Sequence, residues 1–411
     1  MSERARIATS LLAGAAIAVI VALLLIGATA GSVAASCAAA TDRTYLSIAF
    51  ALARRINVGE STGNAVKRAL HTISSDQVLA AAVAADDVTA VDSEVHVLVF
   101  NHEHIVRLRV LRAGAVLDDL GGPLVLAPVS GSLRLGGRAV GTFVMSIQDD
   151  AGYRKLAQRL VGAAVVMRYR GRTVMSDIAA GNERLPARGS VAIGGVHYLV
   201  ASLRDGRFPS GTLRIWLLFR SPPATLARST CAQVGADVLA DVARRAYEES
   251  RSGPPVRPAL TTLALDQALP QALAVGDYPG AAKIVTGMVA GGGFARLQVS
   301  VGGRVIADAG SSIPLLAPLR RPIRDGAGDV VGSALFSVQN AHGYTILAHA
   351  LTDVPVLVRA GRRQLAGSFP GPRDLPARGP VTYGGVHYVV ASFTGTAFPT
   401  ASVRIYVLNR A

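Results

Sequence analysis

The sequence predicts an α+β protein with an N-terminal transmembrane helix followed by two homologous modules, each with leading helices and a mostly antiparallel sheet of five or six strands. Three observations predict this class. The chain begins with a long apolar run, it repeats itself at a spacing of about 190 residues, and within each copy the hydrophobic period changes from helical to alternating.

The apolar run covers 7–35 and contains no charged residue. Roughly 20 apolar residues are enough to span a bilayer as a helix. Arg4 and Arg6 precede the run, and basic residues on this side predict a cytoplasmic N-terminus. We therefore expect residues 1–6 in the cytoplasm, a single-pass membrane anchor at 7–35, and the bulk of the chain on the extracytoplasmic side of the cell membrane.

Two other interpretations of the N-terminus stay open. The small residues at 28–30 suit cleavage of a signal peptide, although such peptides usually have an apolar region of only about 7–15 residues. Lipidation of Cys37 is the other, but the residues before it lack the large aliphatic side chain of that signal. Two cysteines in an exported chain predict a disulfide between Cys37 and Cys231. If the modules were stacked end to end, each cysteine would instead be unpaired.

The repeat is clearest in two segments, LPARGSVAIGGVHYLVAS at 185–202 and LPARGPVTYGGVHYVVAS at 375–392. Further matches lie upstream and downstream at nearly the same spacing. A period of this length indicates tandem domains, because solenoid repeats are only about 20–50 residues long. We expect module 1 at 37–220, a linker at 221–230 and module 2 at 231–411.

Within each module the apolar spacing predicts helices first and strands afterwards. Apolar residues recur every three or four positions over 41–57 and 233–250, and Pro254 stops the second of these helices. In module 1 we expect a further helix at 75–85, an inserted helix at 152–161, a hairpin tip at 101–104, and strands at 95–100, 105–110, 140–147, 164–169, 191–202 and 213–219. In module 2 we expect an inserted helix at 343–352 and strands at 295–301, 331–338, 355–358, 381–392 and 403–408.

This order of elements includes a GRAVGTFVMS strand, a helix beginning at Gly-Tyr, and closing hairpins of the form LPARG, GGVHY and FP. It resembles the extracytoplasmic Cache sensor modules, which are relatives of the PAS fold. The segments at 123–177 and 314–368 and the two hairpins carry the resemblance, which covers most of both modules but includes no diagnostic ligand motif. The resemblance implies a small-molecule pocket on the face of the sheet, roofed by the inserted helix and its flanking loops.

The same resemblance places candidate ligand residues where the central strand meets the inserted helix. The copies differ there, with QDDAGY at 148–153 and QNAHGY at 339–344. Two carboxylates favour a cation or an amine in module 1, whereas Asn and His favour a neutral or acidic ligand in module 2. Capping of the helix explains the two carboxylates equally well. The candidate ligand-binding residues are Asp149, Asp150, Tyr153 and Arg168 in module 1 and Asn340, His342 and Tyr344 in module 2.

The repeated hairpins contain Arg188 and His197 in module 1 and Arg378 and His387 in module 2. These four side chains are candidates for ligand contact. A structural role is the favoured interpretation, because the surrounding Pro and Gly residues build a turn and a tight hairpin that would be repeated for folding reasons.

The net charge of +15 and the pI near 10.6 raise the question of nucleic acid binding. Only three of the 42 basic residues are lysines, and the arginines are scattered singly through strands and turns. A phosphate-binding surface needs a clustered footprint, so we expect no nucleic acid partner. The composition instead matches a GC-rich genome, with weak attraction to anionic lipid headgroups or wall polymers.

The sequence contains no catalytic motif of the common hydrolase, metalloprotease or nucleotide-binding types. We therefore expect a protein that is not an enzyme and that has no cofactor. His102 and His104 fall on one side of an expected strand, but two ligands are too few for a metal site.

These observations predict a membrane-anchored extracytoplasmic protein of the sensor type. It would bind an unidentified small molecule and, lacking an output domain, act through a membrane signalling partner. The alternatives are a structural or adhesive envelope protein without a ligand pocket and, third, an envelope hydrolase. A polar-lined cavity above a sheet would favour the sensor, and a filled sheet face would favour the structural or adhesive protein.

Overall fold

A computed structural model describes residues 41–101, 105–179, 183–220 and 231–411. The expected anchor at 7–35, Cys37, His102, His104 and the linker at 221–230 lie outside these residues, and the side chain of Cys231 is not described. The disulfide therefore stays a prediction. Within the described ranges, no helix combines the length and the apolar character needed to cross a membrane.

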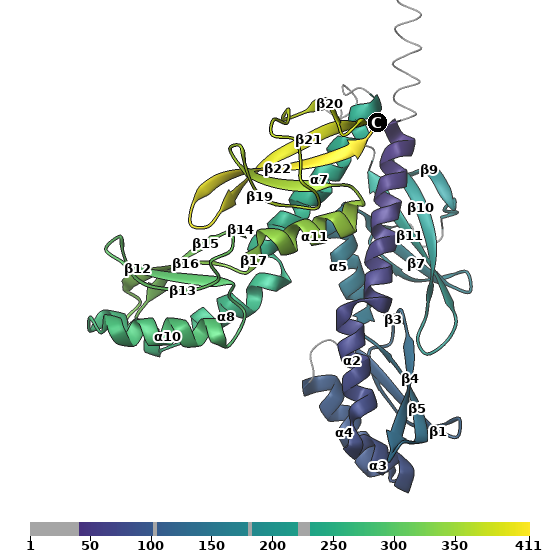
Figure 1. Ribbon diagram of the computed structural model, residues 1–411. Helices are drawn as coiled ribbons and strands as arrows, with labels where there is room; N and C mark the ends of the chain where they lie inside the picture. Colours follow the sequence, from purple (N-terminus) through teal and green to yellow (C-terminus); the bar gives the residue numbers. More distant parts are fainter. Residues whose placement is uncertain (1–40, 102–104, 180–182, 221–230) are drawn as a thin grey trace, which may run out of the picture.

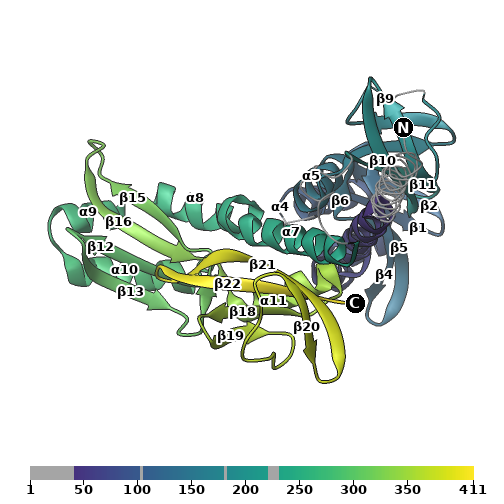
Figure 2. The ribbon, with the colours of Figure 1, turned by 90° about the horizontal axis from the view of Figure 1, so that it is seen from above.

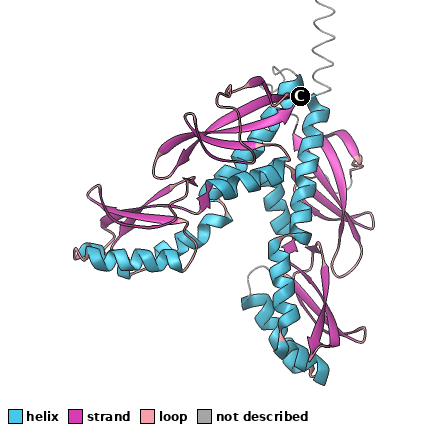
Figure 3. Ribbon diagram, viewed as in Figure 1, coloured by secondary structure: helices cyan, strands magenta, loops and turns pink. Residues whose placement is uncertain are grey.

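The two sequence copies form two arms that meet at one end (Figure 1). Helices run along one side of each arm and sheets along the other (Figure 3). Each copy contains two main sheets, so the expected single sheet of five or six strands is wrong. We call them the tip sheet, at the free end of the arm, and the base sheet, near the place where the arms meet.

In copy 1 the tip sheet has the strand order β2-β1-β5-β4, and the base sheet has the order β8-β7-β11-β10-β9. The strands are β1 (Arg107–Arg112), β2 (Ala115–Gly121), β4 (Val129–Leu135), β5 (Arg138–Ser146), β7 (Ala164–Tyr169), β8 (Arg172–Ser176), β9 (Arg188–Ile193), β10 (Val196–Gly206) and β11 (Thr212–Arg220). A short pair, β3 (Val125–Leu126) and β6 (Gln148–Asp149), lies between them in the sequence. In both sheets the first strand lies between the second and the last, so the two sheets share one topology.

Copy 2 repeats this arrangement with tip order β13-β12-β16-β15. Its base sheet has the order β17-β14-β21-β22-β18-β19, with β20 paired to β21, because the short pair has joined the sheet. The strands are β12 (Arg296–Val301), β13 (Arg304–Gly310), β14 (Leu315–Leu316), β15 (Leu319–Arg324), β16 (Val330–Ser337), β17 (Gln339–Asn340), β18 (Val356–Ala360), β19 (Arg363–Gly367), β20 (Gly379–Tyr383), β21 (Val386–Ala397) and β22 (Ala401–Arg410).

The helices follow the predicted order. A helix over 41–62 and α7 (Cys231–Ser252) are the leading helices, and α5 (Asp150–Val161) and α11 (Ala341–Thr352) are the inserted helices. Figure 2 shows α7 running from the meeting place of the arms toward the second tip. The tip sheets are accompanied by α2 (Asn64–Ser75), α3 (Gln77–Ala85) and α4 (Val88–Asn101) in copy 1, and by η1 (Pro254–Val256), α8 (Arg257–Leu265), α9 (Ala268–Ala274) and α10 (Tyr278–Ala290) in copy 2.

The expected strand at 95–100 is wrong, because this segment belongs to α4. Val91, Val95 and Leu98 are its buried residues, and steps of four and three residues place them on one helical face. They pack in the core of the tip sheet with Leu108 and Phe143. The alternation of valines along this segment therefore reflects a helix that is apolar on more than one side.

One hydrophobic core joins both copies. It includes Leu52 of the first leading helix, Ala243 of α7, Tyr153 of α5, Tyr344 of α11 and Ile405 of the second base sheet. The two tip sheets have separate cores. The arms are consequently not two independent domains, although the sequence repeats as if they were.

The helices of the two copies contact each other reciprocally. Arg55 of the first leading helix pairs with Asp353 beside α11 at 2.6 Å and donates a hydrogen bond to the carbonyl of Ala350 at 3.3 Å. Arg159 of α5 pairs with Glu249 of α7 at 3.3 Å. Positions 55 and 249 correspond in the repeat, as do 159 and 350. The leading helix of each copy therefore contacts the inserted helix of the other, as in a twofold-symmetric dimer.

Both faces of each base sheet are filled. The face away from the helices carries a small apolar cluster that includes Val200 and Trp216 in copy 1 and Val390 and Tyr406 in copy 2. Ile178 and Leu185 pack against this face in copy 1, and the carbonyl of Pro186 accepts a hydrogen bond from the Trp216 indole at 3.1 Å. Among the described residues, apolar side chains occupy the sheet faces on which the Cache resemblance implies a roofed pocket.

Candidate functional site

The residues predicted at the start of the inserted helices act there as helix caps. Asp149 accepts a hydrogen bond from the backbone N–H of Gly152 at 2.6 Å, and Asn340 accepts one from Gly343 at 2.6 Å. Each side chain therefore satisfies a backbone donor of the first helical turn. Asp150 occupies the first turn of α5, where a negative charge is favourable, and His342 is exposed at the start of α11.

The two predicted tyrosines lie in the shared core. Tyr153 and Tyr344 are fully buried, and burial raises the pKa of both phenols far above the ordinary value. The hydroxyl of Tyr344 donates a hydrogen bond to the carbonyl of Ala243 at 2.8 Å. The hydroxyl of Tyr153 is buried and has no hydrogen-bond partner among the described residues.

Tyr153 is close enough to Asp205 that this carboxylate also contributes to the raised pKa of its phenol. Oδ1 of Asp205 accepts a hydrogen bond from the N–H of Gly206 at 2.7 Å, whereas its buried Oδ2 has no partner in the described chain. Burial raises the pKa of Asp205, and the hydrogen bond from Gly206 only partly opposes this. We call Asn57, Tyr153 and Asp205 the buried polar cluster.

Copy 2 fills the corresponding place differently. Gly395 stands at the position of Asp205, and Tyr247 stands at the position of Ala53 on the leading helix. The Tyr247 hydroxyl accepts the N–H of Thr396 at 2.8 Å, which is the amide equivalent to that of Gly206. A side chain at Gly395 would meet the Tyr247 ring at 3.2 Å, so glycine lets the ring pack closely against this strand.

Arg168 and the repeated hairpins lie away from the inserted helices. Arg168 lies over the Trp216 ring at 5.2 Å and donates a hydrogen bond to the carbonyl of Glu183 at 2.6 Å. The candidate hairpin side chains Arg188, His197 and His387 are exposed, and Arg378 pairs with Asp237 of α7 at 2.7 Å. The tight turn predicted between β9 and β10 is confirmed, because Gly194 and Gly195 both have positive φ.

A cleft of about 750 Å³ opens at the other end of α5, where the base sheet of copy 1 meets α7 of copy 2. We call it the inter-copy cleft. Its lining comprises Tyr45, Arg154, Gln158, Gly162, Ala163, Ala164, Asp177, Ile178, Tyr198, Leu218, Arg220 and Arg245. A comparable hollow of about 780 Å³ on the reciprocal side is lined by residues of the first leading helix and α11, without a base-sheet strand.

Three arginines and one aspartate line the inter-copy cleft, so its charge is positive. Arg154 pairs with Asp177 at 2.6 Å, and Arg245 pairs with Asp241 at 2.8 Å. Arg220, at the exposed end of β11, makes no ion pair with any residue that the structure describes. A guanidinium group offers paired donors that match a carboxylate or a phosphate, so this arrangement can bind an anion.

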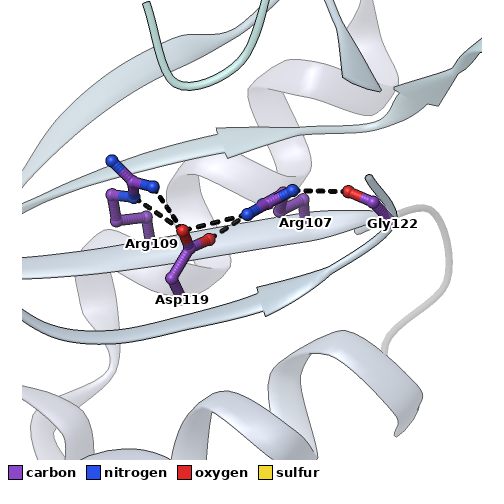
Figure 4. Close-up of polar contacts among 4 residues, drawn as sticks. All are labelled: Arg107, Arg109, Asp119 and Gly122. Atoms are coloured by element: carbon purple, nitrogen blue, oxygen red, sulfur yellow. Dashed lines mark hydrogen bonds and ion pairs between the residues drawn. The ribbon is translucent and has the colours of Figure 1, made fainter. Parts of the chain in front are cut away.

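A second polar cluster lies on β1 and β2 of the copy 1 tip sheet (Figure 4). Asp119 of β2 receives hydrogen bonds from Arg107 at 2.8 and 2.9 Å and from Arg109 at 2.9 Å, and Arg107 also donates to the carbonyl of Gly122 at 2.6 Å. Burial opposes ionisation of Asp119, but the two arginines outweigh it and hold the pKa of the carboxyl below its ordinary value. Arg107 lies 4.9 Å from the ring centre of Phe208, in the loop between β10 and β11, so the cluster links the tip sheet to a loop of the base sheet.

Sequence reasoning missed Asp205, the cleft arginines and the Arg107–Asp119 cluster. The arginines could not be separated from a composition that is rich in arginine throughout. One signal was available for the last cluster, because Arg107 and Asp119 recur as Arg296 and Asp308 at the same offset.

No family model matches the chain, and no curated protein matches it. Five solved chains match, and one of them is an extracellular ligand binding receptor from Desulfohalobium retbaense DSM5692. This match has 12% sequence identity and a TM-score of 0.25, and it covers 42% of this chain and 39% of the receptor chain. The chain thus matches well under half of the receptor's length. A likeness of this size carries no argument about function, and the Cache resemblance stays a prediction.

Proposed function

We propose that the chain is a ligand-binding protein of the sensor type, which takes an anionic small molecule in the inter-copy cleft. The observation that carries this proposal is the convergence of Arg154 and Arg220 from copy 1 with Arg245 from copy 2 around one cleft. Its volume of about 750 Å³ falls in the range of small-molecule sites. Tyr45, Tyr198 and Leu218 supply apolar surface beside the charged groups.

The proposed role is binding rather than catalysis. Because both copies line the cleft, a bound anion would contact both arms at once and favour one relative position of the arms over others. In this proposal a partner protein responds to that change. In this proposal both copies are needed for binding, because the lining of the cleft comes from both.

The test is a thermal-shift and calorimetric titration of the full chain with citrate, phosphate, glutamate and acetate, with neutral sugars and amines as controls. A ligand at a hundredfold excess over its dissociation constant stabilises the folded state by about 2.7 kcal/mol. We expect stabilisation by at least one anion and by none of the controls. We expect Arg220→Gln to weaken that binding at least tenfold, and the exposed Arg204→Gln to leave it unchanged. Equal affinity in the two variants would place the anion elsewhere.

A structural or adhesive role is the second candidate, and one observation favours it. Both faces of the base sheets are filled by side chains, including Trp216 and Tyr406, as expected of a scaffold. Absence of stabilisation by every compound in the titration would favour this candidate over the sensor.

A further inference from the structure

A pocket of about 330 Å³ lies between the tip sheet and the base sheet of copy 2. We call it the junction pocket. Arg296 from the tip sheet, Leu315 of β14, Arg363 of β19 and Phe398 of the loop between β21 and β22 line it. It is separate from the inter-copy cleft, with which it shares no residue.

The same place in copy 1 is filled by two large side chains. Tyr169 ends β7 where Ala360 ends β18, and both lie directly before the turn into the next strand. Arg207 is the backbone β-bridge partner of Leu126, and Ala397 is the β-sheet partner of the equivalent Leu316, so positions 207 and 397 also correspond. In copy 1 the guanidinium of Arg207 lies over the Tyr169 ring at 4.1 Å. In copy 2 the two alanines line the junction pocket instead.

A third position has changed together with these two. Gly211 has a φ of 124°, and a side chain there would meet the Tyr169 ring at 3.2 Å, so both the backbone and the close approach of the tyrosine favour glycine. The corresponding residue of copy 2 is Ala401, which lines the junction pocket. The pocket therefore arises from coordinated differences at three positions, each of which has a small side chain facing the space that Tyr169 and Arg207 fill in copy 1.

The chemistry of the walls defines what the pocket can hold. Its lining has apolar side chains, including Ile313, Leu315 and Leu365, and no acidic residue. Arg296 forms an ion pair with Asp308 and donates two hydrogen bonds of 2.7 Å to it, so its charge is already balanced. Arg363 is exposed and makes no ion pair with any residue of the described ranges. The ring of Phe398 faces the Arg296 guanidinium at 5.2 Å.

We propose that the junction pocket of copy 2 binds an aryl carboxylate, whose ring takes the place of the Tyr169 ring of copy 1 and whose carboxylate pairs with Arg363. The apolar walls suit a flat ring. The guanidinium suits a carboxylate. The site goes beyond the proposed anion binding in the inter-copy cleft and does not depend on it.

The experiment is calorimetric titration of the full chain with 4-hydroxyphenylacetate. The decisive variant gives copy 2 the side chains of copy 1, Ala360→Tyr with Ala397→Arg and Ala401→Gly, and we expect it to lose this binding at least tenfold. Since copy 1 already accommodates these side chains, the variant should retain the melting temperature of the parent. The converse variant, Tyr169→Ala with Arg207→Ala, opens the same place in copy 1 and should add one binding site.

Two controls separate this site from the inter-copy cleft. Arg363→Gln should weaken 4-hydroxyphenylacetate at least tenfold but leave binding of the uncharged 2-(4-hydroxyphenyl)ethanol within twofold, whereas Arg220→Gln should change neither. Undiminished binding in the triple variant with a parental melting temperature would overturn the proposal. Failure of the parent chain to bind 4-hydroxyphenylacetate at millimolar concentration would overturn it as well.

Discussion

The two copies satisfy the same half-buried backbone amide with different side chains. In copy 1 the N–H of Gly206 donates to its neighbour Asp205, and in copy 2 the N–H of Thr396 donates to the distant Tyr247. The first arrangement leaves the Tyr153 hydroxyl and one Asp205 oxygen without partners among the described residues. Between the tip and base sheets the copies also differ: Tyr169 and Arg207 fill this space in copy 1, whereas copy 2 has the junction pocket there. The copies have thus diverged in their interiors while their surface hairpins stayed almost identical.

The largest effect is expected at the residue that distinguishes copy 2. Tyr247→Ala removes a buried ring and leaves the Thr396 amide without its acceptor. We expect a loss of about 3–5 kcal/mol in the free energy of unfolding, as for other buried aromatic residues. Chemical denaturation measures it, with Tyr278→Ala, at an exposed tyrosine, as the matched control within about 0.5 kcal/mol of the parent. Equal losses in both variants would show that Tyr247 does not hold copy 2 together.

Two aspartates of copy 1 should respond to pH with opposite signs. The pKa of Asp119 is lowered on folding, so its ionised form stabilises the fold above about pH 3.9. That stabilisation is lost as the pH falls through the folded pKa. We expect Asp119→Asn to cost about 1–2 kcal/mol at pH 7 and progressively less in acid, as measured by unfolding between pH 3 and 7.

The pKa of Asp205 is raised on folding, so the folded chain holds this proton more tightly than the unfolded chain. Its ionisation costs stability as the pH rises from about 3.9 through the folded pKa. Asp205→Asn keeps an acceptor for Gly206 and removes that cost. The stability of the variant relative to the parent should therefore rise as the pH increases from 3 to 7. A relative stability that falls with pH would contradict the burial of this carboxylate.

Removing the hydroxyl groups of the two buried tyrosines should have a smaller effect on stability, and the effect should differ between the copies. Tyr344→Phe removes the hydrogen bond to Ala243 and should cost about 1 kcal/mol. Tyr153→Phe removes a hydroxyl that has no partner in the described chain, so it should be neutral or stabilising. Melting temperatures of the two variants measure the difference. A cost of about 1 kcal/mol for Tyr153→Phe as well would mean that its hydroxyl is satisfied by bound solvent.

The smallest effect is expected in the repeated hairpins. Arg378 pairs with Asp237, but its side chain is 54% exposed, so Arg378→Ala should cost about 0.5 kcal/mol. The position equivalent to Asp237 in copy 1 is Arg43, which cannot form the same ion pair with Arg188. Arg188→Ala should therefore change the melting temperature less than Arg378→Ala does. The reverse order would show that the hairpin of copy 1 has a role that copy 2 lacks.

Much of the fold could be predicted from the sequence. The leading helices, the inserted helices and most base-sheet strands follow from hydrophobic periodicity, and the repeat aligns them between the copies. In the tip sheets, the central strands β1, β5, β12 and β16 were predicted, but the edge strands such as β2 and β4 were not. Most residues of β2 and β4 are exposed or half-exposed, so their apolar signal is weak. The strand expected at 95–100 was wrong because valines favour strands in general, whereas here Val95 is buried on one face of α4 and Val97 is exposed on another.

The candidate sites were harder to predict than the fold. Asp149 and Asn340 stand at helix starts, where capping and ligand binding call for the same residue types. The buried polar cluster joins residues as far apart as Asn57 and Asp205, and no local pattern connects them. The inter-copy cleft depends on how α7 lies against the first base sheet, which two separate modules would not reveal.

The reciprocal contacts of the leading and inserted helices mean that the unit of duplication is not the unit of folding. A chain cut between the copies would expose the helix faces that bury Leu52 and Ala243, and two such halves would bind each other through the same surface. The protein therefore corresponds to a dimer of two similar subunits that are joined in one chain. That linkage releases the halves from the requirement to remain identical, so one can gain a pocket while the other keeps the tyrosine and the arginine that close it.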